Sequence, residues 1–207
     1  MNELAPEGKF NAYGVKPFIR KPRYQDAHEL ASALRESAES LSEFLDWGYK
    51  SKYADRTQCL RIIQQDLIQD DPYVTYYVFD GHKLIGTTSF GRANQLNGIQ
   101  ITYWVRKSYQ NLGIGKWLFQ EMRDHAFYVW NYDFVEIHTD SANTGSQALA
   151  VGAGGLEWFR YDYETSAWGS TGEMIVWGID HPAIKFEKRV NKLIVGQLHR
   201  PNYGSLG

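Results

Sequence analysis

Three polar side chains share one face of a short predicted strand: Glu136, His138 and Asp140, within and just after "FVEIHT" (134–139). Residues two apart in a strand point to the same side. Glu136 or His138 could take a proton from a nucleophile there, directly or through water. An acidic face would also attract a cationic amine. A surface-facing residue or an ion pair for Glu136, and a structural role for His138, stay open as alternatives.

A second chemical feature is the pair Gly113 and Gly115, where an extended apolar run changes into a helical pattern. The first N–H groups of a helix lack intrahelical partners, and the helix dipole is positive there. Without Cβ atoms in the way, a phosphate could approach the backbone, and Lys116 adds a positive charge. A glycine-rich turn without a ligand is the alternative.

Two common phosphate motifs do not fit this loop. A Walker loop needs Ser or Thr after Lys116, where Trp117 stands, and a Rossmann fingerprint needs glycine where Leu118 stands. The strand before the loop also belongs to an antiparallel meander and not to a βαβ unit. These departures disfavour a protein that uses the loop for ATP.

The elements that must position these residues can be predicted from periodicity. Asp80-Gly81 predicts a hairpin between strands at 73–79 and 83–90. Alternating apolar residues predict a strand at 99–105, and an apolar residue every fourth position from Ile114 predicts a helix. Further strands are expected at 17–22, 134–139, 156–164 and 173–179, and further helices at 25–47, with Asp26 as the N-cap, and at 142–151. This order predicts an α/β (α+β) domain with a mixed sheet.

The domain organisation that we expect is simple. The chain has 207 residues, a length typical of one domain. We expect a loose segment at 1–12, the domain at 13–180, and an extension at 181–207 with an amphipathic helix at 183–198.

Composition limits the partners. The net charge is −2 with no long basic stripe, which disfavours nucleic acid. One cysteine, Cys59, excludes an internal disulfide and a Cys-rich zinc site. No apolar run reaches the ~18 residues of a membrane span, and "MNELAPEGKF" has no signal-peptide core. We therefore expect a cytoplasmic protein, monomer or homodimer, without membrane or metal.

The stretch "VRKSYQNLGIG" resembles the acyl-CoA motif of the GNAT superfamily of N-acetyltransferases, Q/R-x-x-G-x-G/A. "TYWVRKSYQNLGIG" is similar to the strand and loop of the ribosomal-protein N-terminal (alanine/serine) acetyltransferase branch. "SANTGSQALAVGAGGL" resembles the N-x-x-S helix of that branch, matching at Asn143 and Ser146. The resemblance covers roughly 15–180. It departs at Gly155-Leu156, where the branch commonly has Gly-Phe, and in the tail after Asp180.

The resemblance implies a GNAT-like mixed, mostly antiparallel sheet of about seven strands with flanking helices. Strands 99–105 and 134–139 would splay apart to hold the pantetheine arm of acetyl-CoA. Peptide groups near Trp104 and Val105 would polarise the thioester carbonyl. Asn143 would hydrogen-bond the pantetheine; an ordinary helix N-cap is the alternative. The loop that would cradle the pyrophosphate consists of Gln110, Asn111, Leu112, Gly113, Ile114, Gly115 and Lys116.

The implied activity is transfer of an acetyl group from acetyl-CoA to a primary amine by direct attack in a ternary complex, without a metal. A protein N-terminal α-amine is the expected acceptor. Ser146 would face the leaving thiolate, although a helix serine can also bond its own backbone. Glu136 is the candidate base and Tyr103 the third candidate catalytic residue, with Tyr161 and Tyr163 as weaker candidate acids. A polyamine or aminoglycoside-like acceptor, and a non-catalytic acyl-CoA-binding module, stay open.

Overall fold

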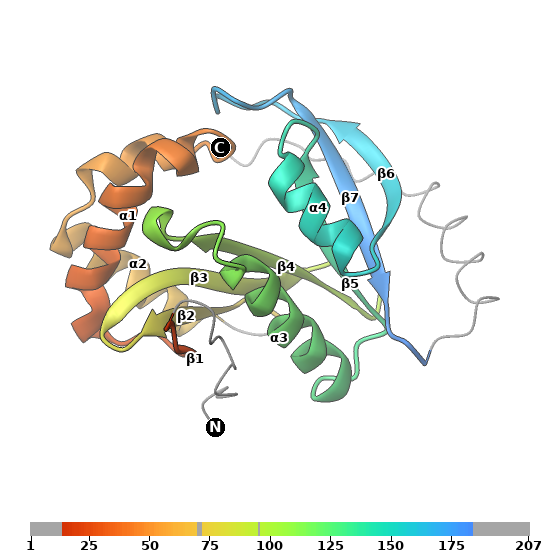
Figure 1. Ribbon diagram of the computed structural model, residues 1–207, viewed down its shortest axis with the longest axis horizontal. Helices are drawn as coiled ribbons and strands as arrows, with labels where there is room; N and C mark the ends of the chain where they lie inside the picture. The colour runs from red at the N-terminus through yellow and green to blue at the C-terminus, as the bar shows by residue number, and fades with distance from the viewer. Residues whose placement is uncertain (1–13, 70–71, 95, 184–207) are drawn as a thin grey trace.

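The structure is a computed structural model that describes residues 14–69, 72–94 and 96–183 (Figure 1). The expected loose segment at 1–12, and the expected extension from residue 184 onward with nearly all of its helix, lie outside the described residues. No helix in the described part of the chain is long and apolar enough to cross a membrane.

Within the described residues, seven strands form one sheet in the order β1-β2-β3-β4-β5-β7-β6. The strands are β1 (Pro17–Arg20), β2 (Val74–Asp80), β3 (Lys83–Arg92), β4 (Gly98–Val105), β5 (Phe134–Asp140), β6 (Leu156–Asp162) and β7 (Glu173–Asp180). All neighbours are antiparallel except β4 and β5, which are parallel. The predicted class, a mixed and mostly antiparallel sheet with flanking helices, is therefore confirmed.

The parallel pair β4 and β5 separates soon after it begins. Pairing runs only from Gly98 opposite Phe134 to Gln100 opposite Glu136, although both strands continue beyond these residues. A Cβ at position 98 would lie 2.0 Å from the Phe134 ring, so only glycine fits where the strands meet. The β5-facing edge of β4 from residue 101 to 105 is thus left without a strand partner.

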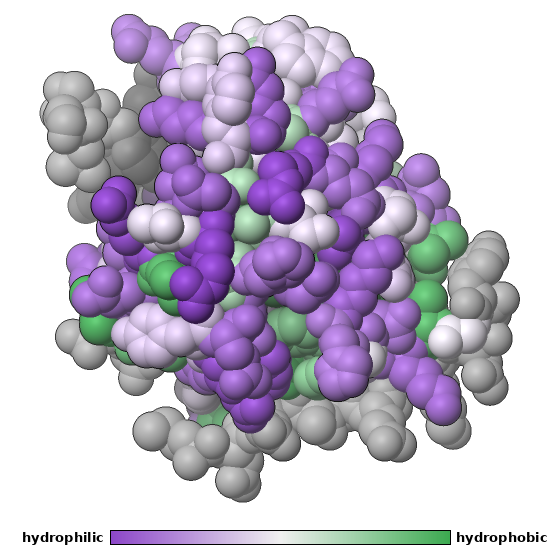
Figure 2. Space-filling view, turned by 90° about the vertical axis from the view of Figure 1, so that its left-hand side faces the viewer, coloured by the Kyte–Doolittle hydropathy of each residue, from purple (hydrophilic) through white to green (hydrophobic). Residues whose placement is uncertain are grey.

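The sheet has a hydrophobic cluster on each face. Tyr76 and Val78 of β2 point to the face covered by α3 (Ile114–Tyr128) and α4 (Thr144–Gly152). Their neighbours Tyr77 and Phe79 point to the face covered by α1 (Ala27–Ser42) and α2 (Arg56–Ile68). Figure 1 shows α3 and α4 in front of the sheet, with α1 and α2 at its left end. The side seen in Figure 2 is mainly hydrophilic, with scattered apolar side chains.

Helix prediction was partly wrong in the first third of the chain. The region 25–47 forms a short 3₁₀ turn, Tyr24–Asp26, followed by α1. Asp26 stands at the N-cap position, but its carboxylate accepts from the Arg20 guanidinium (2.7 Å) and from the Arg23 N–H (2.7 Å) instead of capping α1. Helix α2 was not predicted, although Asp55 caps it by accepting from the Gln58 N–H (2.8 Å).

Candidate active site

Helix α3 begins with an open N-terminus. Its N-cap, Gly113, has φ +79°, in the left-handed region that a residue with a Cβ rarely adopts. Asn111, two residues earlier, also has a positive φ of 61°. No side chain caps the helix, so the first-turn N–H groups, which have no intrahelical acceptor, can bind an anion.

The loop before α3 is fixed to β4 and to α1. Gln110 Nε2 donates to the carbonyl of Val105 (3.0 Å). The N–H of Lys107 donates to Ser37 Oγ (3.0 Å), and the N–H of Ser108 donates to a carboxylate oxygen of α1 (3.0 Å). The loop is thus held before any ligand binds.

Arg106 also anchors this loop to α1, a role that was not predicted from the sequence. Its side chain is buried, and its Nε donates to Glu36 Oε2 (2.7 Å). The guanidinium also donates to the carbonyl of Leu84 (3.1 Å) and to Ser32 Oγ (3.0 Å). Burial favours a higher pKa for Glu36, but hydrogen bonds from Ser108 and Arg106 outweigh it and lower the pKa. The only sequence signal was an arginine directly after a strand.

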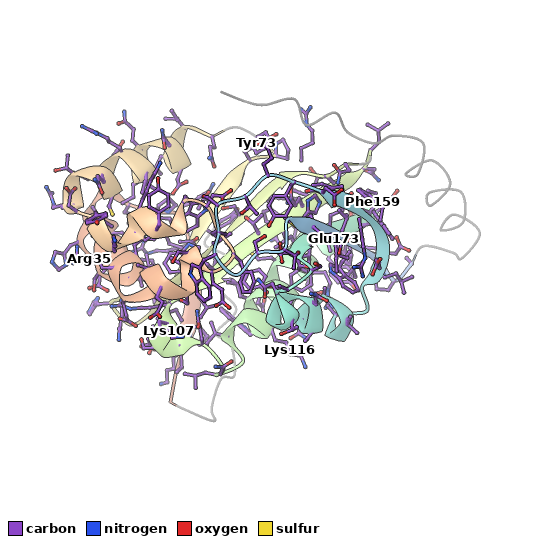
Figure 3. All side chains as sticks on the ribbon, turned by 90° about the horizontal axis from the view of Figure 1, so that it is seen from above. Arg35, Tyr73, Lys107, Lys116, Phe159 and Glu173 are labelled. Atoms are coloured by element: carbon purple, nitrogen blue, oxygen red, sulfur yellow. The ribbon has the colours of Figure 1, made fainter. Side chains whose placement is uncertain are left out.

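Gly115, the second glycine of the loop, lies in a different environment from Gly113. A Cβ on Gly115 would contact the ring of Tyr103 (3.5 Å) and a methyl group of Leu149 (3.6 Å), ordinary packing distances. Gly115 therefore faces β4 and α4, and the role of its missing Cβ in the approach of a phosphate stays a prediction. Lys116 is exposed, and Figure 3 shows it on the same edge of the molecule as Lys107.

Two candidate catalytic residues meet on the α3–α4 side of the sheet. The Tyr103 hydroxyl donates to Ser146 Oγ, with 3.5 Å between the oxygens. Asn143 Oδ1 accepts from the Ser146 N–H (3.0 Å), so Asn143 is the N-cap of α4. Burial raises the pKa of Tyr103, an effect that the Ser146 contact only partly opposes. Tyr103 therefore stays protonated and can donate.

Glu136 is fully buried, so the interpretation as a surface-facing residue was wrong. Its carboxylate accepts from the Asn94 N–H (3.1 Å) and from Asn94 Nδ2 (3.0 Å). His138 Nε2 lies 3.0 Å from the same carboxylate, and the Tyr161 hydroxyl lies 3.4 Å from His138 Nδ1. Glu136 is thus the inner end of a hydrogen-bonded chain that leads to Tyr161 on β6.

Asp140 does not contribute to an acidic cleft, in contrast to the expectation from its position. Its carboxylate accepts from Ser170 Oγ, from the N–H of Thr171 (3.1 Å) and from the Tyr163 hydroxyl (3.0 Å). Burial favours a higher pKa for Asp140, but these bonds and the Ala142 N–H lower it overall. Asp140 ties the β6–β7 loop to β5, and Tyr163 is engaged in the same contact.

A cavity of about 760 Å³ lies on the opposite face of the sheet from Ser146. It is bounded by α1, α2, the 3₁₀ turns Gly48–Tyr53, and strands β2 to β4. Trp104 and Tyr103 line its β4 side, at the point where β4 has parted from β5. We call this space the acceptor cavity. Sequence reasoning missed it because its lining residues come from six separate elements.

The β6–β7 loop, residues 163–172, is fastened to the end of α1. Asp46 Oδ1 accepts from Thr165 Oγ1 (2.8 Å), Ser166 N (2.6 Å) and Ser166 Oγ (3.0 Å). The N–H of Gly169 donates to the carbonyl of Glu43 (2.9 Å). The loop thereby joins the two halves of the sheet that part at β4 and β5.

The sequence matches the family model of the acetyltransferase (GNAT) domain over residues 18–155, two thirds of the chain. The chain belongs to this family. It is therefore an N-acetyltransferase that takes its acetyl group from acetyl-CoA. No curated protein matches the sequence.

Solved structures share the fold at low identity. The RimL ribosomal L7/L12 alpha-N-protein acetyltransferase in complex with coenzyme A has a TM-score of 0.71 and 16% identity, covering 84% of this chain and 99% of that one. The microcin C7 self-immunity acetyltransferase MccE, in complex with acetyl-CoA and AMP, has a TM-score of 0.71 and 17% identity, covering 86% and 98%. Mycobacterium smegmatis RimJ has a TM-score of 0.70 and 17% identity, covering 85% and 88%.

The residues on this chain fit a coenzyme A molecule. The uncapped start of α3 at Gly113 suits a pyrophosphate, and the unpaired edge of β4 suits the amide groups of a pantetheine arm. Ser146 and Tyr103 lie on the α3 side of that edge. No group of three or more His, Cys, Asp or Glu in the described residues is placed to hold a metal ion.

Proposed function

We propose that this GNAT acetyltransferase acetylates a protein N-terminal α-amine that enters through the acceptor cavity. The observation that carries the proposal is the position of this cavity at Trp104, beside the unpaired edge of β4. A cavity of about 760 Å³ takes the first few residues of an extended chain, with the α-amine directed at the thioester. In this proposal the catalytic domain spans residues 13–180, and 181–207 are an extension to it.

On the coenzyme side, the loop from Gln110 to Lys116 binds the pyrophosphate through first-turn N–H groups, with Lys116 adding positive charge. Peptide groups near Trp104 and Val105 polarise the thioester carbonyl, and Asn143 contributes to the pantetheine site in addition to capping α4. The anchoring by Arg106 supports this assignment, because a preorganised loop loses little conformational entropy on binding.

Acetyl-CoA supplies the acetyl group, and Ser146 stabilises the departing thiolate. The support is the contact between Tyr103 and Ser146, whose hydroxyl oxygens lie 3.5 Å apart. A serine hydroxyl has one proton and two acceptor lone pairs, so Ser146 can accept from Tyr103 while its own proton points at the sulfur. The raised pKa of Tyr103 keeps this donor protonated through neutral pH.

Glu136 acts on the amine proton through His138 and not by direct contact with the amine. Its full burial excludes direct contact in this conformation, whereas His138 is partly exposed at the next position on the same face. We propose that His138 accepts the amine proton and that Glu136 stabilises the resulting imidazolium. Tyr161 is the outer member of this relay.

Two of the solved structures support the choice of acceptor. The RimL structure carries the name of an α-N-protein acetyltransferase. A ribosomal-protein-S5-alanine acetyltransferase from Vibrio fischeri also shares the fold, with a TM-score of 0.62 and 17% identity, covering 82% of this chain and 95% of that one. The MccE structure, which holds AMP, favours a small-molecule amine as the second candidate.

A thiol-release assay with acetyl-CoA tests the proposal. The acceptors are a peptide with a free N-terminus, the same peptide with a blocked N-terminus and an internal lysine, a polyamine, and an aminoglycoside. We expect release with the free N-terminus, and mass spectrometry of the product should place the acetyl group on the first residue. Thiol release with a small amine but not with the free N-terminus would contradict the proposal and favour the second candidate, a small-molecule acceptor.

A further inference from the structure

The floor of the acceptor cavity consists of two rows of side chains, each crossing three strands. The first row is Tyr77–Thr87–Trp104, and the second is Thr75–Ser89–Thr102. Neighbouring strands are about 4.8 Å apart, so the β2 and β4 ends of a row are about 10 Å apart. The thioester site at Trp104 is at one end of this floor, and β2 is at the other.

A single carboxylate lines the far end of the cavity in the described residues. Asp66 of α2 is partly buried, and its Oδ2 accepts from the Tyr77 hydroxyl (3.0 Å). Burial raises the pKa of Asp66, although hydrogen bonds from Tyr77 and Thr75 and the charge of Lys21 oppose the shift. Because burial has the larger effect, a cation bound beside the carboxylate would stabilise its charged form.

The rest of the lining does not supply that cation. Lys50, the basic residue of the lining, belongs to the 3₁₀ turns, and its ammonium lies over the Tyr49 ring at 5.5 Å. Trp47 and Tyr53 instead give the cavity aromatic walls. Such walls accept the hydrocarbon stem and the charged end of an arginine or lysine side chain.

We infer that Asp66 is a specificity-determining residue that selects acceptors with a second positive charge about 10 Å from the reacting amine. The inference rests on the proposed function, since it takes the amine end of the acceptor to lie at Trp104. For a peptide, an extended chain advances about 3.4 Å per residue, so a basic side chain at the second or third position reaches Asp66.

Peptides that differ in charge but not in shape can test this inference. Arginine and citrulline have nearly the same size, but citrulline is neutral, and neither side chain offers an amine for acetylation. Peptides with arginine or citrulline at the second or third position are compared by kcat/KM with the wild-type enzyme and with Asp66→Asn. Asp124→Asn, which removes a carboxylate that pairs with Arg123 on α3, is the control.

The wild type and the control should prefer one of the arginine peptides by about tenfold, the effect of a hydrogen bond to a charged group. Asp66→Asn should abolish this preference and leave the citrulline peptide nearly unchanged. Equal rates for arginine and citrulline with the wild type, or a preference that survives in Asp66→Asn, would overturn the inference.

A diamine separates this inference from the proposed function. Hexane-1,6-diamine and hexylamine are compared with the same three enzymes. If no peptide is acetylated but the diamine is preferred in an Asp66-dependent way, the α-amine proposal is wrong and the role of Asp66 is retained. If peptides and monoamine react without regard to the second charge, the inference fails and the function stands. If no amine reacts, both are wrong.

Discussion

The two faces of the central sheet provide the two halves of the proposed site in different ways. The α3 face offers the backbone groups at the start of α3, from Gly113 to Lys116, together with the side chains of Tyr103, Asn143 and Ser146. The α1 face offers a cavity lined by side chains, from Leu30 of α1 to Trp104 of β4. A backbone-built half suits a cosubstrate common to a whole family. A side-chain-built half suits an acceptor that differs among members.

Among the variants that test this difference between the two faces, Gly113→Val should have the largest effect. A β-branched residue is strained at φ +79°, and its side chain would block the approach of a phosphate. We expect coenzyme A affinity to fall by about 100-fold, which corresponds to about 2.7 kcal/mol. Calorimetry on the folded variant measures it.

Gly115→Ala is the matched control, because a Cβ there makes ordinary contacts with Tyr103 and Leu149. Its affinity should stay within about threefold of the wild type, a difference below 1 kcal/mol. Unchanged affinity in Gly113→Val would contradict the pyrophosphate assignment. An equal loss in both variants would mean that the loop is sensitive to any added volume.

Glu136→Gln tests the α1 face. Glutamine keeps an acceptor for Asn94 but cannot stabilise a charged His138. We expect the rate to fall by about 100-fold at low pH, where the amine is protonated. The rate should recover as the pH approaches the pKa of the amine, near 8 for an α-amine and near 10 for a polyamine.

The pH–rate profile of Glu136→Gln therefore reports on base and acceptor together. His138→Gln should give the same profile if the proton passes through the imidazole. A uniform loss at every pH would show instead that Glu136 positions the substrate or supports the fold through Asn94.

Ser146→Ala should have a smaller effect, confined to the coenzyme half. Loss of the hydroxyl removes the proposed donor to the thiolate, and we expect kcat to fall by about tenfold. Coenzyme A affinity should hardly change, because the Ser146 N–H that Asn143 caps is still present. Steady-state kinetics and calorimetry separate these quantities. Turnover equal to that of the wild type would leave Ser146 with only a structural role.

The residues of the proposed coenzyme half could be chosen from the sequence because their patterns are local. Gly113, the alternation through Tyr103, and the cap at Asn143 each leave a pattern within a few residues. The hairpin after Asp80 and the mixed, mostly antiparallel sheet were also predicted, and the structure confirms both.

The acceptor half could not be read in this way, because its contacts are distant in sequence. Asp66 meets Tyr77 only when α2 packs on β2, and Glu136 meets Asn94 across 42 positions. The burial of Glu136 was not predicted. The alternation of residues correctly placed it on the polar face of β5, but it did not indicate that the side chain is buried in a hydrogen-bonded network. The direction in which a Cβ on Gly115 would point, toward Tyr103 and Leu149, is likewise set by packing between distant segments.

The smallest effect is expected where the two halves are joined, at the contact of Asp46 with the β6–β7 loop. Asp46 is exposed, and its carboxylate accepts three hydrogen bonds from Thr165 and Ser166. Asp46→Ala should loosen residues 163–172 and raise the KM for the acceptor by about threefold, which corresponds to less than 1 kcal/mol. The affinity for coenzyme A should not change. Hydrogen exchange of the loop and acceptor kinetics measure these effects. An altered coenzyme A affinity would mean that the loop also supports the α3 face.

The same contact predicts a pH dependence with a definite sign. Burial favours a higher pKa for Asp46, but hydrogen bonds from the Ser166 N–H and from the hydroxyls of Thr165 and Ser166 lower it overall. A carboxylate whose pKa is lower in the folded protein stabilises the fold above its ordinary pKa, near 4, and loses that contribution as the pH falls through the lower value. Hydrogen exchange in residues 163–172 of the wild type, corrected for intrinsic rates, should therefore be constant from pH 8 to about 5 and rise only below about pH 4. In Asp46→Ala the exchange of residues 165–169 should be faster at neutral pH and should lack this acid-dependent rise, whereas residues 170–172, which Asp140 holds, should keep it. If both proteins showed the same rise in acid in residues 165–169, another carboxylate, with Asp140 at the root of the loop as the first to test, would hold the loop in place of Asp46.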